Sequence, residues 1–135
     1  MTNRRRVSTG TIWEGRVGYS RAIEVGGAGG AGNMIAVAGT VAADEQGNIL
    51  HPGSAYQQAC FILRRIEAAL KELDASLADV IRTRIYIINM NHQEEVGRAH
   101  AEAFADIRPA CTMVGVKELA DPHALVEIEA DAVKN

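Results

Sequence analysis

The segment from Val80 to Ile88 constrains the fold most, because its side chains alternate between two unlike sets. Every second position is charged or aromatic, and these positions hold Arg82, Arg84 and Tyr86. The positions between them hold Thr83, Ile85 and Ile87. A period of two residues is that of a β-strand. This segment is therefore predicted to lie in a sheet that has one apolar and one polar face.

Two amphipathic helices are predicted to cover the apolar face. The first begins at Ser54, which forms a capping box with Gln57, and its apolar stripe repeats every 3.6 residues. That stripe consists of Ala59, Ile62, Leu63, Ile66, Leu70 and Leu73. The second helix is predicted to be capped by Asn91 with Glu94 and to end at Pro109, and its stripe consists of Val96, Ala99, Ala103 and Ile107. Two helices can cover only one face of such a sheet, so the other face must be solvated or buried against another subunit.

The remaining segments complete an α+β order within a single domain over residues 1–135. An N-terminal strand or hairpin is predicted over residues 3–8 and 10–14, where the chain is polar and β-compatible. Further strands are predicted over residues 21–25, 33–40, 111–116 and 124–133. The chain is poor in large aromatic anchors, which make up 4% of it, so Ala, Ile, Val and Leu must fill the core.

Composition excludes several classes of protein. No window approaches the roughly 20 consecutive apolar residues of a membrane-spanning helix, and no signal peptide follows the arginines at positions 4–6, so a cytoplasmic location is expected. A net charge of −3 argues against a nucleic acid as the main partner. Cys60 and Cys111 form no CxxC motif, so neither a disulfide framework nor a zinc ribbon is predicted.

Two further patterns have simple structural interpretations. Residues 27–32 match GxGxxG, but a strand-like run follows them where a dinucleotide site needs a helix, so a flexible hairpin loop is predicted. The histidines do not have the spacing of metal ligands, and they are His51, His92, His100 and His123. No metal and no cofactor are therefore predicted.

A row of carboxylates is the strongest chemical signal in the chain. Glu127, Glu129 and Asp131 are two residues apart on a predicted strand, so they share one face. Arg82 and Arg84 have the same spacing and would offset the repulsion between the carboxylates on a neighbouring strand. The row is therefore either a cross-strand charge ladder on the helix-free face, or it includes a carboxylate with a perturbed pKa that acts on water or substrate.

Three other side chains leave two interpretations open. Cys111 is either a thiolate nucleophile or a small buried hydrophobic residue. Trp13 and Tyr19 lie in a glycine-spaced segment, where aromatic residues either form the walls of a ligand site or pack without a further role.

A set of short segments occurs along the chain in a characteristic order. They are Gly18-Tyr-Ser-Arg-Ala22 with Val25-Gly26, Ala36-Val-Ala-Gly39, the Ser54 helix with Leu77-Ala-Asp-Val-Ile-Arg-Thr83, Asn89-Met-Asn91, Arg108-Pro-Ala110 and Val126-Glu-Ile-Glu-Ala130. In this order they resemble the RidA/YjgF family, also called endoribonuclease L-PSP-like, over residues 18–133. The resemblance implies a chorismate-mutase-like fold, a homotrimer with a central barrel, and ligand clefts between subunits. Family members of the RidA type hydrolyse enamines and imines such as 2-aminoacrylate.

The family's site residues carry over in part. Tyr19 matches the tyrosine that lines the pocket, and Glu127 matches the glutamate that positions the attacking water. The family's carboxylate-binding arginine follows Pro-Ala, where this chain reads Pro109-Ala110-Cys111-Thr112. A thiol cannot supply two parallel hydrogen-bond donors to a carboxylate, which argues against standard 2-imino acid deamination and resembles the subfamilies without that arginine. Arg21 could supply a relocated positive charge.

The resemblance thus predicts a homotrimer with an intersubunit cleft that acts on a small metabolite. We expect the cleft to be lined by Tyr19, Cys111 and Glu127, with Trp13 and Arg21 nearby, and to hydrolyse an enamine, an imine or a related C–N bond. The alternative is a non-catalytic trimer that binds or protects a small ligand. A ribonuclease is implied only by the family's older name, and the acidic chain favours it least.

Overall fold

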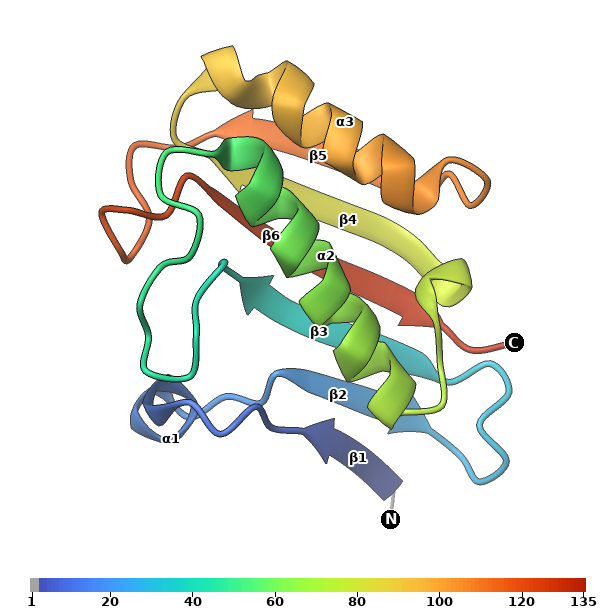
Figure 1. The fold of residues 1–135 in the computed structure, drawn as a ribbon. Coiled ribbons are helices and arrows are strands. Elements are labelled where there is room, and N and C mark those ends of the chain that lie inside the picture. The colour runs from blue at the N-terminus through green and yellow to red at the C-terminus, as the bar shows by residue number, and fades with distance from the viewer. Residues whose placement is uncertain (1–2) are drawn as a thin grey trace.

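The computed structural model describes residues 3–135, which form a six-stranded sheet with two long helices on one face (Figure 1). The strands are β1 (Asn3–Val7), β2 (Ala22–Gly26), β3 (Met34–Thr40), β4 (Val80–Ile87), β5 (Ala110–Gly115) and β6 (Val126–Val133). The helices are α1 (Ile12–Val17), α2 (Ala55–Glu72) and α3 (Gln93–Phe104), with 3₁₀ turns at Leu77–Asp79 and Met90–His92. The predicted α+β class, with α2 and α3 covering one face, is confirmed.

The order of strands across the sheet is β1-β2-β3-β6-β4-β5. Neighbouring strands are antiparallel except β4 and β5, which are parallel and are connected through α3. The last strand, β6, therefore lies between β3 and β4 in the middle of the sheet. No helix within residues 3–135 is long and apolar enough to cross a membrane.

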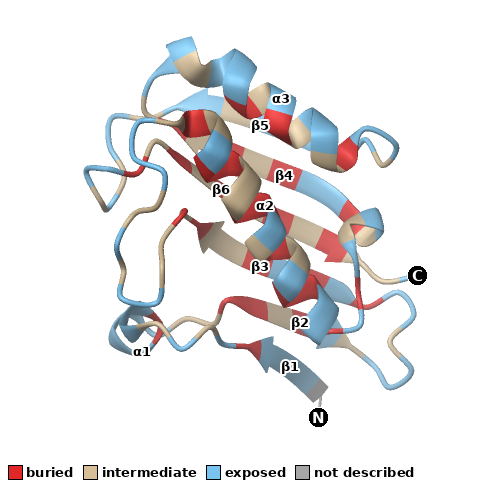
Figure 2. Cartoon of the chain, viewed as in Figure 1, coloured by how far each residue is buried: buried red, intermediate tan, exposed pale blue. Residues whose placement is uncertain are grey.

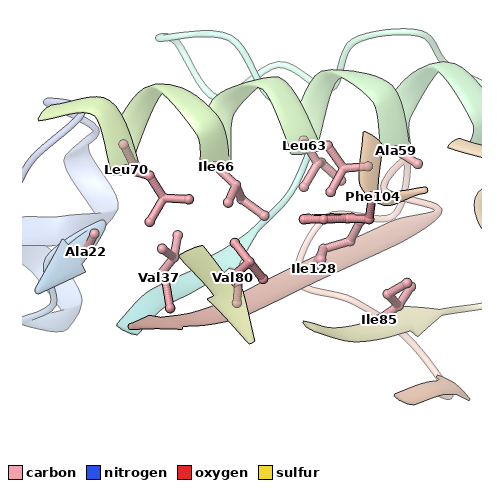
Figure 3. Close-up of a cluster of buried hydrophobic side chains, with 14 of the residues drawn as sticks. Ala22, Val37, Ala59, Leu63, Ile66, Leu70, Val80, Ile85, Phe104 and Ile128 are labelled. Atoms are coloured by element: carbon pink, nitrogen blue, oxygen red, sulfur yellow. The ribbon is translucent and has the colours of Figure 1, made fainter. Parts of the chain in front are cut away.

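The core lies between α2 and the sheet. Figure 3 shows Leu70, Ile66 and Leu63 of α2 pointing toward apolar side chains of the strands, such as Val37 and Ile128. All six residues of the predicted stripe on α2 are buried. Phe104 is the only aromatic residue that is fully buried within the described part of the chain, so aliphatic side chains and alanine fill the core as the composition predicts.

The two long helices begin in different ways. The Ser54 side chain accepts a hydrogen bond from the Gln57 backbone N–H at 3.2 Å, so the predicted cap of α2 is confirmed. The predicted cap of α3 by Asn91 is wrong. The Asn89 side chain instead accepts from the Asn91 N–H at 2.9 Å and starts a 3₁₀ turn, from which α3 continues without a side-chain cap. Helix α3 also ends at Phe104, before Pro109.

The strand predicted over residues 3–8 is confirmed as β1, but the β-structure predicted over residues 10–14 is wrong. These residues enter α1, because the Glu14 carboxylate accepts hydrogen bonds from the Thr9 backbone N–H at 3.0 Å and the Thr9 hydroxyl at 2.6 Å. Such local bonds to polar side chains compete with strand pairing. Gly18 then ends the helix in the left-handed region, with φ 86°.

The glycine-rich loop connects two antiparallel strands, so the hairpin predicted at residues 27–32 is confirmed. A buried carboxylate fixes its base, since Glu24 accepts from the Asn33 amide at 2.7 Å and the Lys134 ammonium at 3.1 Å. Burial raises the pKa of Glu24, but these hydrogen bonds outweigh burial and leave the pKa below its ordinary value. Glu24 thus links the loop to the C-terminal segment.

Neither of the long helices α2 and α3 covers the opposite face of the sheet, which we call the helix-free face (Figure 1). Strand β6 alternates between buried and half-buried residues, as its colours show (Figure 2), and the buried ones include Ile128, Ala130 and Ala132. The residues between them face the other way. Apolar side chains are also exposed on the same face, since Val25 is 40% and Met34 is 46% accessible. The predicted two-faced sheet is therefore present, and its second face is open in the single chain.

Candidate functional site

A groove of about 640 Å³ lies on the helix-free face, next to α1 and the segment that follows it. Tyr19 forms part of one wall, and Glu129 and Asp131 of β6 form part of another. Arg6 of β1 also lines the groove, because Arg6 pairs with Ile23 across the strands and so points to this face. The groove thus brings the N-terminal segment against the carboxylate row.

Arg21 lies behind the wall of the groove and is only 6% exposed. Its Nη1 donates to the Gly39 carbonyl oxygen at 2.7 Å and to the Thr40 hydroxyl at 2.9 Å. Its Nη2 donates to the Tyr19 phenol oxygen at 3.2 Å, and the guanidinium lies 5.4 Å from the Tyr19 ring centroid. Arg21 therefore ties the start of β2 to the end of β3 and orients Tyr19.

Glu127 lies directly above Gly39. A methyl group on Gly39 would lie 2.2 Å from Oε2 of Glu127, so the carboxylate occupies the space that a side chain there would need. The pairing of β3 with β6 shifts register between Val37 and Thr40, which places Gly39 in a bulge. Bulges often occur next to active sites, where they change the direction of a side chain.

The electrostatics of Glu127 differ from those of an ordinary surface glutamate. Burial raises the pKa of Glu127, the positive charge of Arg21 lowers it, Glu129 raises it, and the net direction is upward. No residue within 3–135 donates a hydrogen bond to its carboxylate. Glu127 is therefore a half-buried carboxylate with unused acceptor positions, as a residue that binds water or substrate requires.

The other two carboxylates of the row are paired. Arg84 lies 3.2 Å from Asp131 and 3.9 Å from Glu129, and the Tyr86 hydroxyl donates to Glu129. That hydrogen bond is the main cause that raises the pKa of Tyr86. The predicted cross-strand charge ladder is thus confirmed for Glu129 and Asp131. Glu127 is not part of this ladder and has a raised pKa, and its action on water or substrate stays a prediction.

Two predicted site residues do not join this group within one chain. Trp13 is 51% exposed and lies close to Gly47, outside the groove. Cys111 is exposed on the edge strand β5 and pairs with Thr83, whose hydroxyl lies 2.9 Å from His100 on α3. Paired residues share a face, so Cys111 belongs to the helix-covered side. A cleft that contains both Cys111 and Glu127 would need a second copy of the chain, and it stays a prediction.

The structure adds residues that the sequence did not point out. Gly39 makes room for Glu127, Thr40 anchors Arg21, and Glu14 lines the groove with its carboxylate bonded to Thr9. The one available signal was Gly39, which interrupts an apolar strand where glycine often marks a bulge or a close approach.

Comparison with known proteins identifies the family. The model of the family described as endoribonuclease L-PSP matches residues 13–134. An uncharacterised protein of Streptomyces coelicolor is 34% identical over 131 residues, which cover 96% of this chain and 92% of that protein. The 3-aminoacrylate deaminase RutC of Acinetobacter baylyi is 33% identical over 104 residues, 76% of this chain and 80% of that enzyme.

Solved structures give the same result. A member of the YjgF/YER057c/UK114 family from Mycobacterium tuberculosis is 44% identical, has a TM-score of 0.83, and aligns over 97% of this chain and 99% of its own. A structure from Thermotoga maritima, described as a putative endoribonuclease, is 31% identical with a TM-score of 0.77 and 87% of both chains covered. The chain therefore belongs to the RidA/YjgF family, whose model is named endoribonuclease L-PSP.

Proposed function

We propose that the protein hydrolyses a small enamine or imine, and that Glu127 positions and activates the attacking water. The observation that carries this proposal is the unpaired, half-buried Glu127 carboxylate above Gly39, beside the Arg21–Tyr19 pair. The similarity to a 3-aminoacrylate deaminase supports an enamine or its imine tautomer as the substrate class.

The reaction needs one water molecule and no external oxidant or reductant. Water adds to the imine carbon while Glu127 accepts one of its protons and passes it to the nitrogen, which gives a carbinolamine. The hydroxyl proton of the carbinolamine then moves through Glu127 to the amine, the C–N bond breaks, the carbonyl forms and ammonia leaves. The product is the corresponding ketone or keto acid. A carboxylate whose pKa is raised by burial is a stronger base than an ordinary glutamate.

The assembly that we propose is a homotrimer in which the helix-free faces meet. One observation supports it: this face exposes apolar side chains such as Val25 and Met34. Burial of such apolar surface favours association. Light scattering at micromolar concentration is expected to give three times the chain mass of 14.5 kDa. A monomer would contradict this part of the proposal.

The missing arginine leads to a test of the substrate class. We expect wild type to hydrolyse 2-aminoacrylate poorly, because Cys111 offers no bidentate donor to the substrate carboxylate. A Cys111→Arg variant is expected to gain activity by about tenfold or more, which corresponds to one charge-assisted hydrogen bond. The assay generates 2-aminoacrylate in situ and measures the keto acid.

The control for this test is Gln57→Arg, which places the same charge at an exposed position of α2. A gain in Cys111→Arg alone would show that the water-activating residues are intact and that position 111 contacts the substrate carboxylate. If neither wild type nor Cys111→Arg acts on 2-aminoacrylate or on uncharged imines, the protein is instead a binding module of the same fold.

A further inference from the structure

Arg21 is the charged group in the site that is buried most deeply, and it makes three hydrogen bonds to other residues of the chain. Two of them hold the bulge in β3, through the Gly39 carbonyl and the Thr40 hydroxyl, and the third reaches the Tyr19 phenol. A buried guanidinium is costly unless its donors are satisfied. Its Nε nevertheless has no hydrogen-bond partner among the described residues, so the fold keeps this charge at a cost.

The bond to Tyr19 sets the role of the phenol. An arginine only donates hydrogen bonds, so the Tyr19 oxygen is the acceptor at 3.2 Å. The phenol hydrogen must then point elsewhere, and no acceptor within residues 3–135 receives it. Because Tyr19 lines the groove, this hydrogen is available to an acceptor atom of a bound molecule.

The bonds to the β3 bulge set the position of Glu127. Arg21 holds the carbonyl of Gly39, and the Glu127 carboxylate lies against the Cα of the same residue. The positive charge of Arg21 also attracts this carboxylate and favours its ionised form, against the effects of burial and of Glu129. One guanidinium therefore acts on both Tyr19 and Glu127.

We propose that Arg21 is a positioning residue that presents Tyr19 as a hydrogen-bond donor and Glu127 as an acceptor to the same bound molecule. This inference rests on the proposed function, because it assigns the substrate's acceptor atom to Tyr19 and the attacking water to Glu127. The Nη atoms of Arg21 already donate to residues of the chain, so Arg21 does not offer two free parallel donors to a substrate carboxylate. The substrate class that fits best is an imine or enamine whose reacting end carries a neutral acceptor, such as a carbonyl oxygen or the imine nitrogen.

The test compares Arg21→Met, which removes charge and donors, with Arg21→Lys, which keeps the charge. The readout is the pKa of Glu127, followed by NMR titration of its side-chain carboxyl carbon in the intact protein. We expect this pKa to rise in Arg21→Met and to remain close to the wild-type value in Arg21→Lys. A purely structural Arg21 would lower the melting temperature of both variants and leave the pKa of Glu127 unchanged, which would overturn the inference.

Tyr19→Phe supplies the second arm, and it decides the matter if Arg21→Met does not fold. It removes the phenol hydroxyl and leaves the bonds of Arg21 to Gly39 and Thr40 and its charge near Glu127, so the pKa of Glu127 is expected to stay constant. On the imine that wild type hydrolyses, kcat is expected to fall by about tenfold or more, as for the loss of one positioned donor. Unchanged kcat and KM in Tyr19→Phe would overturn the donor role.

The titration needs no substrate, so the two proposals can fail separately. If the pKa of Glu127 responds to Arg21 as expected while wild type hydrolyses no imine, the positioning role stands and the proposed reaction fails. If wild type hydrolyses imines while the pKa of Glu127 is the same in wild type and in Arg21→Met, the reaction stands and the positioning role fails.

Discussion

A Glu127→Gln variant is expected to hydrolyse its imine substrate at least about 100-fold more slowly than wild type, because the amide cannot accept a proton from water. The geometry of the site should survive, since glutamine has the same shape and Glu127 accepts no hydrogen bond from another described residue. We therefore expect kcat to fall much more than KM rises. Steady-state kinetics of the purified variants provide the measurement.

The pH dependence of wild type tests the same role. The reaction needs the ionised carboxylate, so kcat/KM should be constant at high pH and fall as pH drops through the pKa of Glu127. Burial raises this pKa above the ordinary value for glutamate, so the loss should begin at higher pH than for an exposed carboxylate. The groups that act on Glu127 are Arg21 and Glu129, and Glu129 repels its charge.

The matched control is Glu67→Gln, which makes the same change on α2 on the other side of the sheet. Its kcat and its pH profile are expected to equal those of wild type. A Glu127→Gln variant with wild-type turnover would remove Glu127 from the mechanism.

The elements that could be predicted from the sequence are those whose burial leaves a periodic pattern. Helix α2 and strand β4 each bury one side, so their apolar residues recur every 3.6 and every two positions. The first turn of α3 and the segment over residues 10–14 carry no such pattern. There, hydrogen bonds to the side chains of Asn89 and Glu14 determine the backbone, and propensity alone assigned both incorrectly.

The site could be predicted only in part, for a related reason. The spacing along β6 predicted that Glu127, Glu129 and Asp131 share one face and that arginines of a neighbouring strand lie beside them, because these relations depend on spacing within strands. Of the two predicted arginines, Arg84 makes the ion pairs. The contact between Glu127 and Gly39 depends on how β3 pairs with β6 across a register shift, and spacing within one strand does not contain that shift. The hydrogen bonds of Arg21 to Gly39 and Thr40 also depend on how separate strands lie together, so spacing within one strand does not predict them.

A Gly39→Ala variant is expected to lose nearly as much activity as Glu127→Gln, although it changes no chemical group of the site. The added methyl carbon would lie 2.2 Å from Oε2 and 3.1 Å from the carboxyl carbon of Glu127, so one of them must move. The carboxylate is the end of a flexible side chain, whereas Gly39 is fixed by strand pairing and by Arg21. The carboxylate should therefore swing away and leave the water unpositioned.

The cost to stability should be much smaller than the cost to activity. Overpacking of this kind destabilises a fold by about 1–3 kcal/mol, and movement of the carboxylate should keep the value at the lower end. The matched control is Gly97→Ala in α3, where an added methyl meets no atom within 4 Å. Alanine is the better helix former, so Gly97→Ala should stabilise by about 0.5–1 kcal/mol and leave activity unchanged.

A double variant separates the steric explanation from a general weakening of the sheet. If alanine at position 39 acts by displacing Glu127, the Gly39→Ala/Glu127→Gln variant should be little slower than Glu127→Gln alone, because both changes remove the same function. If alanine acts by loosening β3, the two losses should multiply and the free energy of unfolding should fall as well. Kinetics and urea unfolding of the four proteins distinguish these results. Multiplied losses would mean that Gly39 supports the sheet and does not make room for the carboxylate.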